Sequence, residues 1–253
     1  MGKIVAIGGG EIGRAGYSIE TTEIDREIIR LSGKPSPRLL FIPTASSDSE
    51  GYLNDVKRHF GKRLGCEVDV LYLIREKPSR QEIERRILGS DIIYVGGGNT
   101  LKMLQAWRKT GTDKILRRAY ERGIVLSGVS AGAICWFRYG SSDTRKFSGK
   151  GGGLVRVRGL GFVNATYCPH YDLEKDRKPH VKRMMRKTPG VALTFDNCSA
   201  IEIVNGDFRV ISSKKSANAY KAYWEKGKYC HETIEKRKEF LPLGILTGKL
   251  KPV

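Results

Sequence analysis

Short apolar runs rich in β-branched residues recur along the first half of the chain, separated by amphipathic stretches. The runs predict strands at residues 3–9, 38–45, 67–74, 91–98 and 123–130. The stretches between them predict helices at about 20–33, 50–64, 79–88, 100–109 and 112–121. Because continuous apolar strands joined through helices are typical of parallel sheets covered on both faces, we predict an α/β fold.

The pattern changes after residue 150. A glycine-rich loop precedes a strand-like run that ends in a turn at 169–172, and a helix is predicted at about 175–187. Two strands follow, joined by the hairpin signal Asn-Gly-Asp at 205–207. No linker or repeat separates these parts. We therefore interpret residues 1–253 as a single α/β domain, in which about 214–253 form a basic C-terminal extension with a β edge and a tail.

The composition is basic, with Lys+Arg 46 against Asp+Glu 27 and a formal net charge of +19. Such a balance can indicate nucleic-acid partners or acidic substrates. Here the charges are spread along the chain without an arginine-rich run that alternates with aromatic residues. Most of them therefore predict solvated helix faces, and we do not expect nucleic acid to be a partner.

No apolar run approaches the roughly 18 residues of a membrane span. The first residues are too glycine-rich for a signal peptide, so we expect a cytoplasmic protein without a membrane partner. The five cysteines lack C-x-x-C spacing, which argues against zinc and against a disulfide framework. We expect reduced thiols and neither metal nor cofactor. The oligomeric state is left open, with a homodimer as one alternative.

A dinucleotide-type motif follows the first predicted strand, through Gly8, Gly10 and Gly13. A dinucleotide site would also need a helix directly behind the glycines and an acidic residue at the end of the second strand. The next residues are polar instead, and the second strand ends in "IPTAS". We interpret the glycines as a tight turn and do not predict a nicotinamide cofactor.

The segment "IVLSGVSAGAICWF" contains a serine flanked by glycines in a G-x-S-x-G pattern, where a buried strand runs into a predicted helix. In such a turn Gly128 and Gly132 avoid clashes, and the hydroxyl of Ser130 projects from the carboxyl end of the sheet. The N–H of Ala131 would face an oxyanion formed there. The alternative is a glycine-lined turn with an inactive serine.

Four histidines could take the proton that a nucleophilic serine must lose. His59 and His231 lie in polar segments that predict solvated side chains, and His180 lies in a basic predicted helix. His170 follows an apolar strand-like run and a proline, which makes it the best candidate base. Its alternative role is that of a hydrogen-bonded structural histidine.

The imidazole needs an acceptor to hold its tautomer. Asp143 is the acidic residue between Ser130 and His170, Asp172 lies two places beyond the histidine, and Asp196 is a more distant candidate. The residues leave this choice open.

A second oxyanion donor is expected from another loop at the same sheet edge. The segment "YVGGGNT" at 94–100 ends a buried strand and begins a helix, and its glycines would let bare amides approach a substrate. Asn99 or Thr100 is the candidate helix cap, and Asn99 is also a candidate substrate contact. The alternative is a tight turn without a ligand.

Together, "IYVGGGNT", "GIVLSGVSAGAICWF" and "CPHYD" resemble the peptidase E (aspartyl dipeptidase) and cyanophycinase family of serine peptidases over about residues 1–212. The likeness is nearest to uncharacterised bacterial peptidase E-like members. It implies a three-layer fold like the class I glutamine amidotransferase domain and a serine peptidase that acts on short peptides. It also implies Ser130 as nucleophile, His170 as base, and Gly97 or Gly98 with Ala131 as oxyanion hole.

The family's usual order selects Asp143 as the third residue, whereas the amidotransferase relatives would select Asp172. Peptidase E removes an N-terminal aspartate and reads its carboxylate with an arginine. Arg177 is the candidate here, with a surface helix position as its alternative. Rival functions are a cyanophycinase-like hydrolase, an amidase or esterase that uses the same serine, and a non-catalytic nucleic-acid-binding protein.

Overall fold

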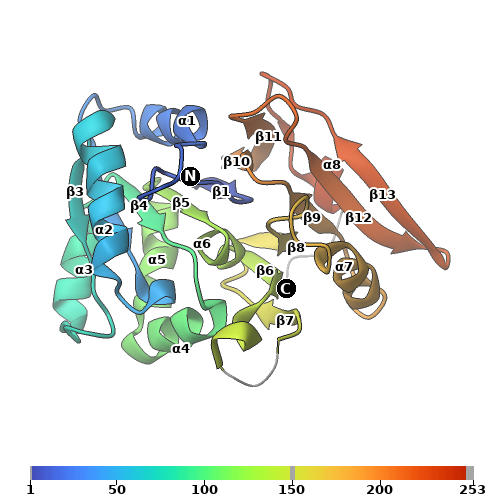
Figure 1. Cartoon of the computed structure of the whole chain (residues 1–253), viewed down its shortest axis with the longest axis horizontal. Coiled ribbons are helices and arrows are strands. Elements are labelled where there is room, and N and C mark those ends of the chain that lie inside the picture. Colours follow the sequence, from blue (N-terminus) through green and yellow to red (C-terminus); the bar gives the residue numbers. More distant parts are fainter. Residues whose placement is uncertain (1, 149–151, 249–253) are drawn as a thin grey trace.

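The computed structural model describes residues 2–148 and 152–248, and it contains two neighbouring sheets with helices packed on them (Figure 1). The first sheet has the order β14-β11-β10-β1-β5-β4-β2-β3. Its run from β1 to β3 is parallel, as predicted. The strands of this sheet are β1 (Lys3–Ile7), β2 (Arg38–Ile42), β3 (Glu67–Val70), β4 (Ile92–Val95), β5 (Val125–Val129), β10 (Ser199–Val204), β11 (Asp207–Ser212) and β14 (Leu241–Pro242).

The second sheet has the order β13-β12-β9-β8-β6-β7 and was not predicted as a separate unit. Its central strands β6, β8 and β9 are parallel. Its edges are antiparallel. The strands of this sheet are β6 (Phe137–Ser142), β7 (Val155–Arg158), β8 (Val163–Cys168), β9 (Ala192–Phe195), β12 (Ala219–Glu225) and β13 (Lys228–Ile234).

Helices cover both faces of the first sheet, which confirms the predicted three-layer α/β architecture. The face that carries Ile7 and Phe41 packs with α1 and α2, and the face that carries Ile93 and Leu126 packs with α3, α4 and α5. The helices are α1 (Thr22–Ser32), α2 (Glu50–Val56), α3 (Arg80–Leu88), α4 (Thr100–Thr110), α5 (Thr112–Glu121), α6 (Ala131–Ile134), α7 (Arg177–Met185) and α8 (Gly244–Thr247), with shorter helical turns η1 (Thr44–Ser46), η2 (Lys57–Arg63) and η3 (Thr144–Ser148).

The helix expected after Ser130 is shorter than its apolar pattern indicates. α6 ends at Ile134, and the chain enters β6 at Phe137. Trp136 and Phe137 are fully buried. A short apolar run predicts a buried strand as well as a buried helix, so the sequence pattern did not fix where the helix ends. The short helix brings the chain from the first sheet directly into the second.

His59 is a correction to the sequence interpretation, because it is buried and not solvated. Its side chain lies in the π-helical turn η2, and Nε2 is 2.8 Å from Oδ2 of the buried Asp25. A lone histidine in a polar segment gave no sign of this distant acidic partner.

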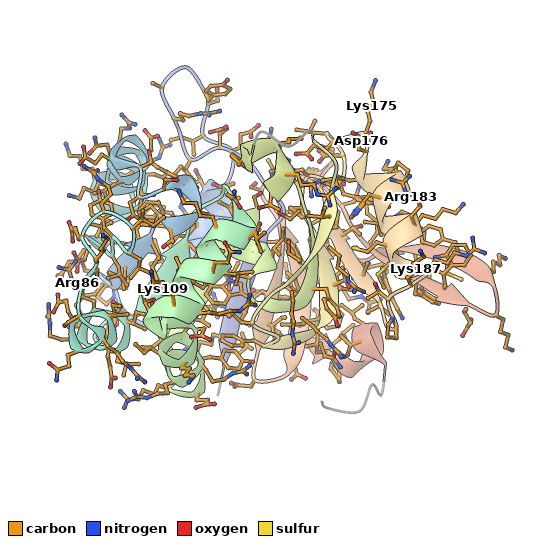
Figure 2. All side chains as sticks on the ribbon, turned by 90° about the horizontal axis from the view of Figure 1, so that it is seen from below. Arg86, Lys109, Lys175, Asp176, Arg183 and Lys187 are labelled. Carbon is orange, nitrogen blue, oxygen red and sulfur yellow. The ribbon has the colours of Figure 1, made fainter. Side chains whose placement is uncertain are left out.

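The C-terminal segment contributes to both sheets. β12 pairs with β9 and β14 pairs with β11. Residues 249–253 of the predicted extension lie outside the described residues. The positive charges project from many elements, as Lys109, Lys175, Arg183 and Lys187 illustrate (Figure 2). Within the described ranges, no helix is both long and apolar enough to cross a membrane.

Candidate active site

Ser130 occupies the turn between β5 and α6. Its backbone has φ 54° and ψ −110°, a region that costs a non-glycine residue about 1–3 kcal/mol. The turn is held by the N–H of Ser130, which donates to the carbonyl of Ile7 at 3.1 Å. Such strain persists only where the surroundings enforce it, and here it directs the hydroxyl out of the sheet.

The two flanking glycines are sterically required. A Cβ on Gly128 would lie 2.6 Å from the carbonyl oxygen of Gly132, and a Cβ on Gly132 would lie 2.1 Å from that of Val95. Both distances are far below van der Waals contact. The physical reason that the sequence suggested for the G-x-S-x-G pattern therefore holds in the structure.

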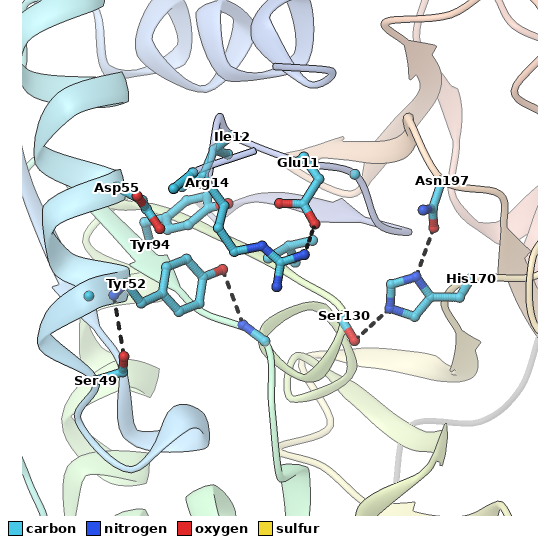
Figure 3. A pocket seen from close by; sticks show the side chains of 15 residues that line it. Glu11, Ile12, Arg14, Ser49, Tyr52, Asp55, Tyr94, Ser130, His170 and Asn197 are labelled. Atoms are coloured by element: carbon cyan, nitrogen blue, oxygen red, sulfur yellow. Dashed lines mark hydrogen bonds and ion pairs between the residues drawn. The ribbon is translucent and has the colours of Figure 1, made fainter. Parts of the chain in front are cut away.

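His170 reaches Ser130 from the second sheet. It follows β8, and its N–H donates to the carbonyl of Gly8 at 3.0 Å. Nε2 lies 2.9 Å from the Ser130 hydroxyl oxygen, as Figure 3 shows. The predicted pair therefore meets within hydrogen-bond distance across 40 residues of chain.

The other imidazole nitrogen contacts Asn197, and this differs from the predicted aspartate. Nδ1 of His170 donates to Oδ1 of Asn197 at 2.7 Å. Asp172 instead accepts the backbone N–H of Asn197 at 2.9 Å, and Asp143 lies 3.9 Å from Lys146. Asp172 thus supports the residue that contacts the imidazole.

Asp196, the more distant candidate, accepts the backbone N–H of Asn218 at 2.9 Å. Sequence reasoning missed Asn197 because it considered only carboxylates as partners for the imidazole. A neutral amide oxygen fixes the same tautomer, and Cys-His-Asn sites use this arrangement. The available signal was the position of Asn197 in the loop that joins β9 to β10, at the same edge as His170.

The protonation of His170 suits a base. Burial lowers the pKa of this imidazole below its usual value, and the hydrogen bond with Asn197 opposes the shift. With Nδ1–H donated to Asn197, the lone pair of Nε2 faces the Ser130 hydroxyl. The neutral, accepting form is therefore favoured at pH 7.

The Ser130–His170 pair opens into a cavity of about 680 Å³. Figure 3 shows Tyr52, Tyr94, Glu11 and Arg14 around it. The cavity is lined by Gly10, Glu11, Ile12, Arg14, Ala15, Ser49, Gly51, Tyr52, Asp55, Tyr94, Gly97, Val129, Ser130, His170 and Asn197. Its wall includes the glycine-rich loop after β1, which the sequence interpretation treated only as a turn.

The predicted oxyanion glycines have different surroundings. Gly97 lines the cavity, its N–H donates to the Tyr52 hydroxyl at 3.4 Å, and a Cβ there would lie 3.5 Å from that of Ser130. Gly98 has φ +135° and packs against the carbonyl of Ala45, where a Cβ would lie at 2.3 Å. Gly97 is therefore the loop amide beside the serine. Ala131 follows Ser130 as the first residue of α6.

The two predicted substrate-binding side chains are engaged elsewhere. Asn99 caps α4, where Oδ1 accepts the N–H of Lys102 at 3.0 Å. Arg177 is 1% exposed, so it is neither a surface residue nor part of the cavity wall described above. Its guanidinium donates to Glu174 at 2.8 Å and to the carbonyl of Ser141 at 2.6 Å. The arginine of the cavity is Arg14, which the sequence analysis did not single out.

Comparison with known proteins gives consistent results. The model of Peptidase family S51 matches residues 4–211. The uncharacterised peptidase YgaJ of Bacillus subtilis is 37% identical over 225 residues, which cover 87% of this chain and 92% of the relative. A peptidase from an acI-B1 actinobacterium has a similar fold, with a TM-score of 0.70 at 18% identity over 96% of this chain and 97% of its own. A candidate peptidase E from Listeria monocytogenes superposes with a TM-score of 0.63 at 22% identity, over 84% and 98% of the two chains.

Proposed function

The chain belongs to peptidase family S51, and from this premise we propose that it is a serine exopeptidase that hydrolyses short peptides. The contact between Ser130 and the accepting nitrogen of His170, at 2.9 Å, carries the proposal. Their orientation at the mouth of a 680 Å³ cavity leaves room for a few residues of substrate. The free thiols of the five cysteines support the cytoplasmic location expected from the sequence.

In the proposed reaction, His170 Nε2 takes the proton of Ser130 while the serine oxygen attacks the scissile carbonyl. Asn197 replaces the expected aspartate as the group that orients the imidazole. The oxyanion would be bound by the N–H of Ala131 and by that of Gly97, which would exchange its long 3.4 Å bond to the Tyr52 hydroxyl for one to the oxyanion. His170 then gives its proton to the leaving amine. In the second half of the reaction His170 takes a proton from water, the water oxygen attacks the acyl-serine ester, and His170 returns the proton to the oxygen of Ser130.

An N-terminal aspartate preference is the finer part of the proposal. It requires a cation in the cavity, and Arg14 supports it there better than the buried Arg177. A screen of dipeptides that compares Asp-X with neutral X-X pairs separates this preference from a general dipeptidase activity. Turnover of amides and esters of the same acyl group separates a peptidase from an amidase or esterase.

A fluorophosphonate probe tests the nucleophile directly. We expect the protein to be labelled, and Ser130→Ala to lose the label. Ser36→Ala is the matched control, since Ser36 is exposed and its hydroxyl donates to the carbonyl of Gly65, at 2.8 Å, away from the cavity wall described above. Equal labelling of Ser130→Ala and the control would exclude Ser130 as the nucleophile.

A further inference from the structure

One side of the cavity is acidic, although the protein as a whole is basic. Glu11 and Asp55 both line the cavity, and in the view of Figure 3 Arg14 lies between them, with Asp55 on the side away from His170. Among the described lining residues these give two carboxylates against one guanidinium. The formal net charge of the chain is +19. The cavity wall therefore does not carry the excess of positive charge of the whole chain, so a cationic group can approach it.

The two carboxylates differ in how fully they are paired. Asp55 is 15% exposed and forms an ion pair with Arg58. Oε1 of Glu11 accepts one hydrogen bond from Arg14, at 2.7 Å. The side chain of Glu11 is 31% exposed and that of Arg14 is 55% exposed. Among the described residues, Oε2 accepts no hydrogen bond from a side chain or from the backbone. An exposed pair of this kind is weak, so a ligand can share the carboxylate of Glu11 at little cost.

The backbone holds Glu11 close to the reacting pair. Its N–H donates to Glu20 at 3.2 Å, and the N–H of Glu20 donates back to the carbonyl of Glu11 at 2.7 Å. Two residues earlier, Gly9 packs so tightly on His170 that a Cβ would lie 2.5 Å from Nδ1. Two residues span at most about 7 Å. The Cα of Glu11 therefore lies within about 7 Å of that of Gly9, the residue that packs on His170.

The remaining wall also suits an ammonium group. The rings of Tyr52 and Tyr94 line the cavity. Burial raises the pKa of Tyr52 to about 12 and also raises the pKa of Tyr94 well above its usual value, so both rings are neutral at pH 7. Neutral aromatic faces attract cations and repel anions.

We propose that the carboxylate of Glu11 binds the α-ammonium group of the substrate's first residue, so that the enzyme requires a free N-terminus. This inference rests on the proposed function. The ammonium offers three N–H donors, and Oε2 of Glu11 is a cavity acceptor to which no described residue donates. Recognition of this charge places the carbonyl of the same residue beside Ser130 and excludes N-blocked peptides and interior segments of long chains.

The test compares the best dipeptide of the screen with its N-acetyl derivative. We expect the wild-type protein to cleave the free amine with about tenfold to a hundredfold higher kcat/KM, because hydrogen bonds to charged groups have this strength. Glu11→Gln should lower kcat/KM for the free amine by about tenfold to a hundredfold, mainly through KM, and leave the acetylated peptide unchanged. Glu23→Gln is the matched control, since Glu23 forms the same kind of exposed pair with Arg26 on α1.

The pH profile is a readout that a merely structural role of Glu11 would not move. Above about pH 8 the α-amine loses its proton, so kcat/KM for the free dipeptide should fall there in the wild type and less in Glu11→Gln. Fluorophosphonate labelling of Ser130, which needs no amine, should be equal in both proteins.

Equal cleavage of free and acetylated peptides, or an unchanged ratio in Glu11→Gln, would overturn the proposal while the serine peptidase stands. Absence of both labelling and hydrolysis in the wild type would instead overturn the proposed function.

Discussion

Replacement of Asn197 by aspartate tests the assignment of His170 as the base. Oδ1 of Asn197 lies 2.7 Å from Nδ1 of His170, so the variant puts a carboxylate where a neutral amide now accepts. The opposite charge stabilises the imidazolium and raises the pKa of His170, which burial now holds below its usual value.

The size of this change follows from the distance. Charge centres about 4 Å apart interact by about 1 to 4 kcal/mol for effective dielectric constants between those of water and of a protein surface. At about 1.4 kcal/mol per unit, this corresponds to a rise of about one to three pKa units. Asp172, whose Oδ1 accepts the N–H of residue 197, repels the new carboxylate and favours the lower part of that range.

The assay is the rate of fluorophosphonate labelling between pH 4 and 10. The base must be neutral, so the rate falls as pH drops through the pKa of His170. We expect the midpoint of this acidic limb below 6.5 in the wild type and about one to three units higher in Asn197→Asp. Asn205→Asp, the same change in the exposed β10–β11 turn, should leave it in place. An unmoved midpoint in a folded Asn197→Asp protein would refute the role of His170.

Two further predictions concern steric fit and stability. Gly9→Ala would place a Cβ 2.1 Å from Asn197 Oδ1 and 2.5 Å from His170 Nδ1, so fluorophosphonate labelling of Ser130 should slow at least about tenfold. The control Gly51→Ala, in which the nearest atom to the new Cβ is 3.9 Å away, should be labelled at the normal rate. Burial raises the pKa of Glu202 to about 7, whereas its unfolded value is near 4.5, so the unfolded chain loses this proton first as pH rises. The melting temperature should therefore fall between pH 4.5 and 7, and less steeply in Glu202→Gln; parallel melting curves for the two proteins would contradict this account.

The first half of the fold could be predicted because its signals are local. Strand β4 is an unbroken apolar run in the sequence, and the glycines around Ser130 indicate the turn because they lack a Cβ. Asn205 and Gly206 also gave the β10–β11 hairpin correctly. These features depend on neighbours in sequence.

The second sheet and the third member of the candidate site depend on contacts between distant segments. Asn197 and His170 are 27 residues apart, and the pattern of apolar and polar residues does not predict contacts between segments so far apart in sequence. Asp143 and Asp172 were reasonable candidates because a carboxylate stabilises an imidazolium. In the structure the side-chain amide of Asn197, in the loop that joins β9 to β10, contacts the imidazole instead. Arg177 was expected either in the site or on the surface of a helix. In the structure it is buried, and its guanidinium donates to Glu174 and to the carbonyl of Ser141, which is distant in sequence.

The serine and the histidine arrive from different sheets, and the bonds that align them come from main-chain carbonyls of Gly8 and Gly9, which accept from His170 and Cys198 at 3.0 and 2.8 Å. The ensemble thus draws on the beginning, the middle and the later part of the polypeptide. Under the proposed mechanism, a nascent chain that still holds residue 197 in the ribosome would lack the group that orients His170. Turnover in a refolding experiment would then report completed tertiary assembly.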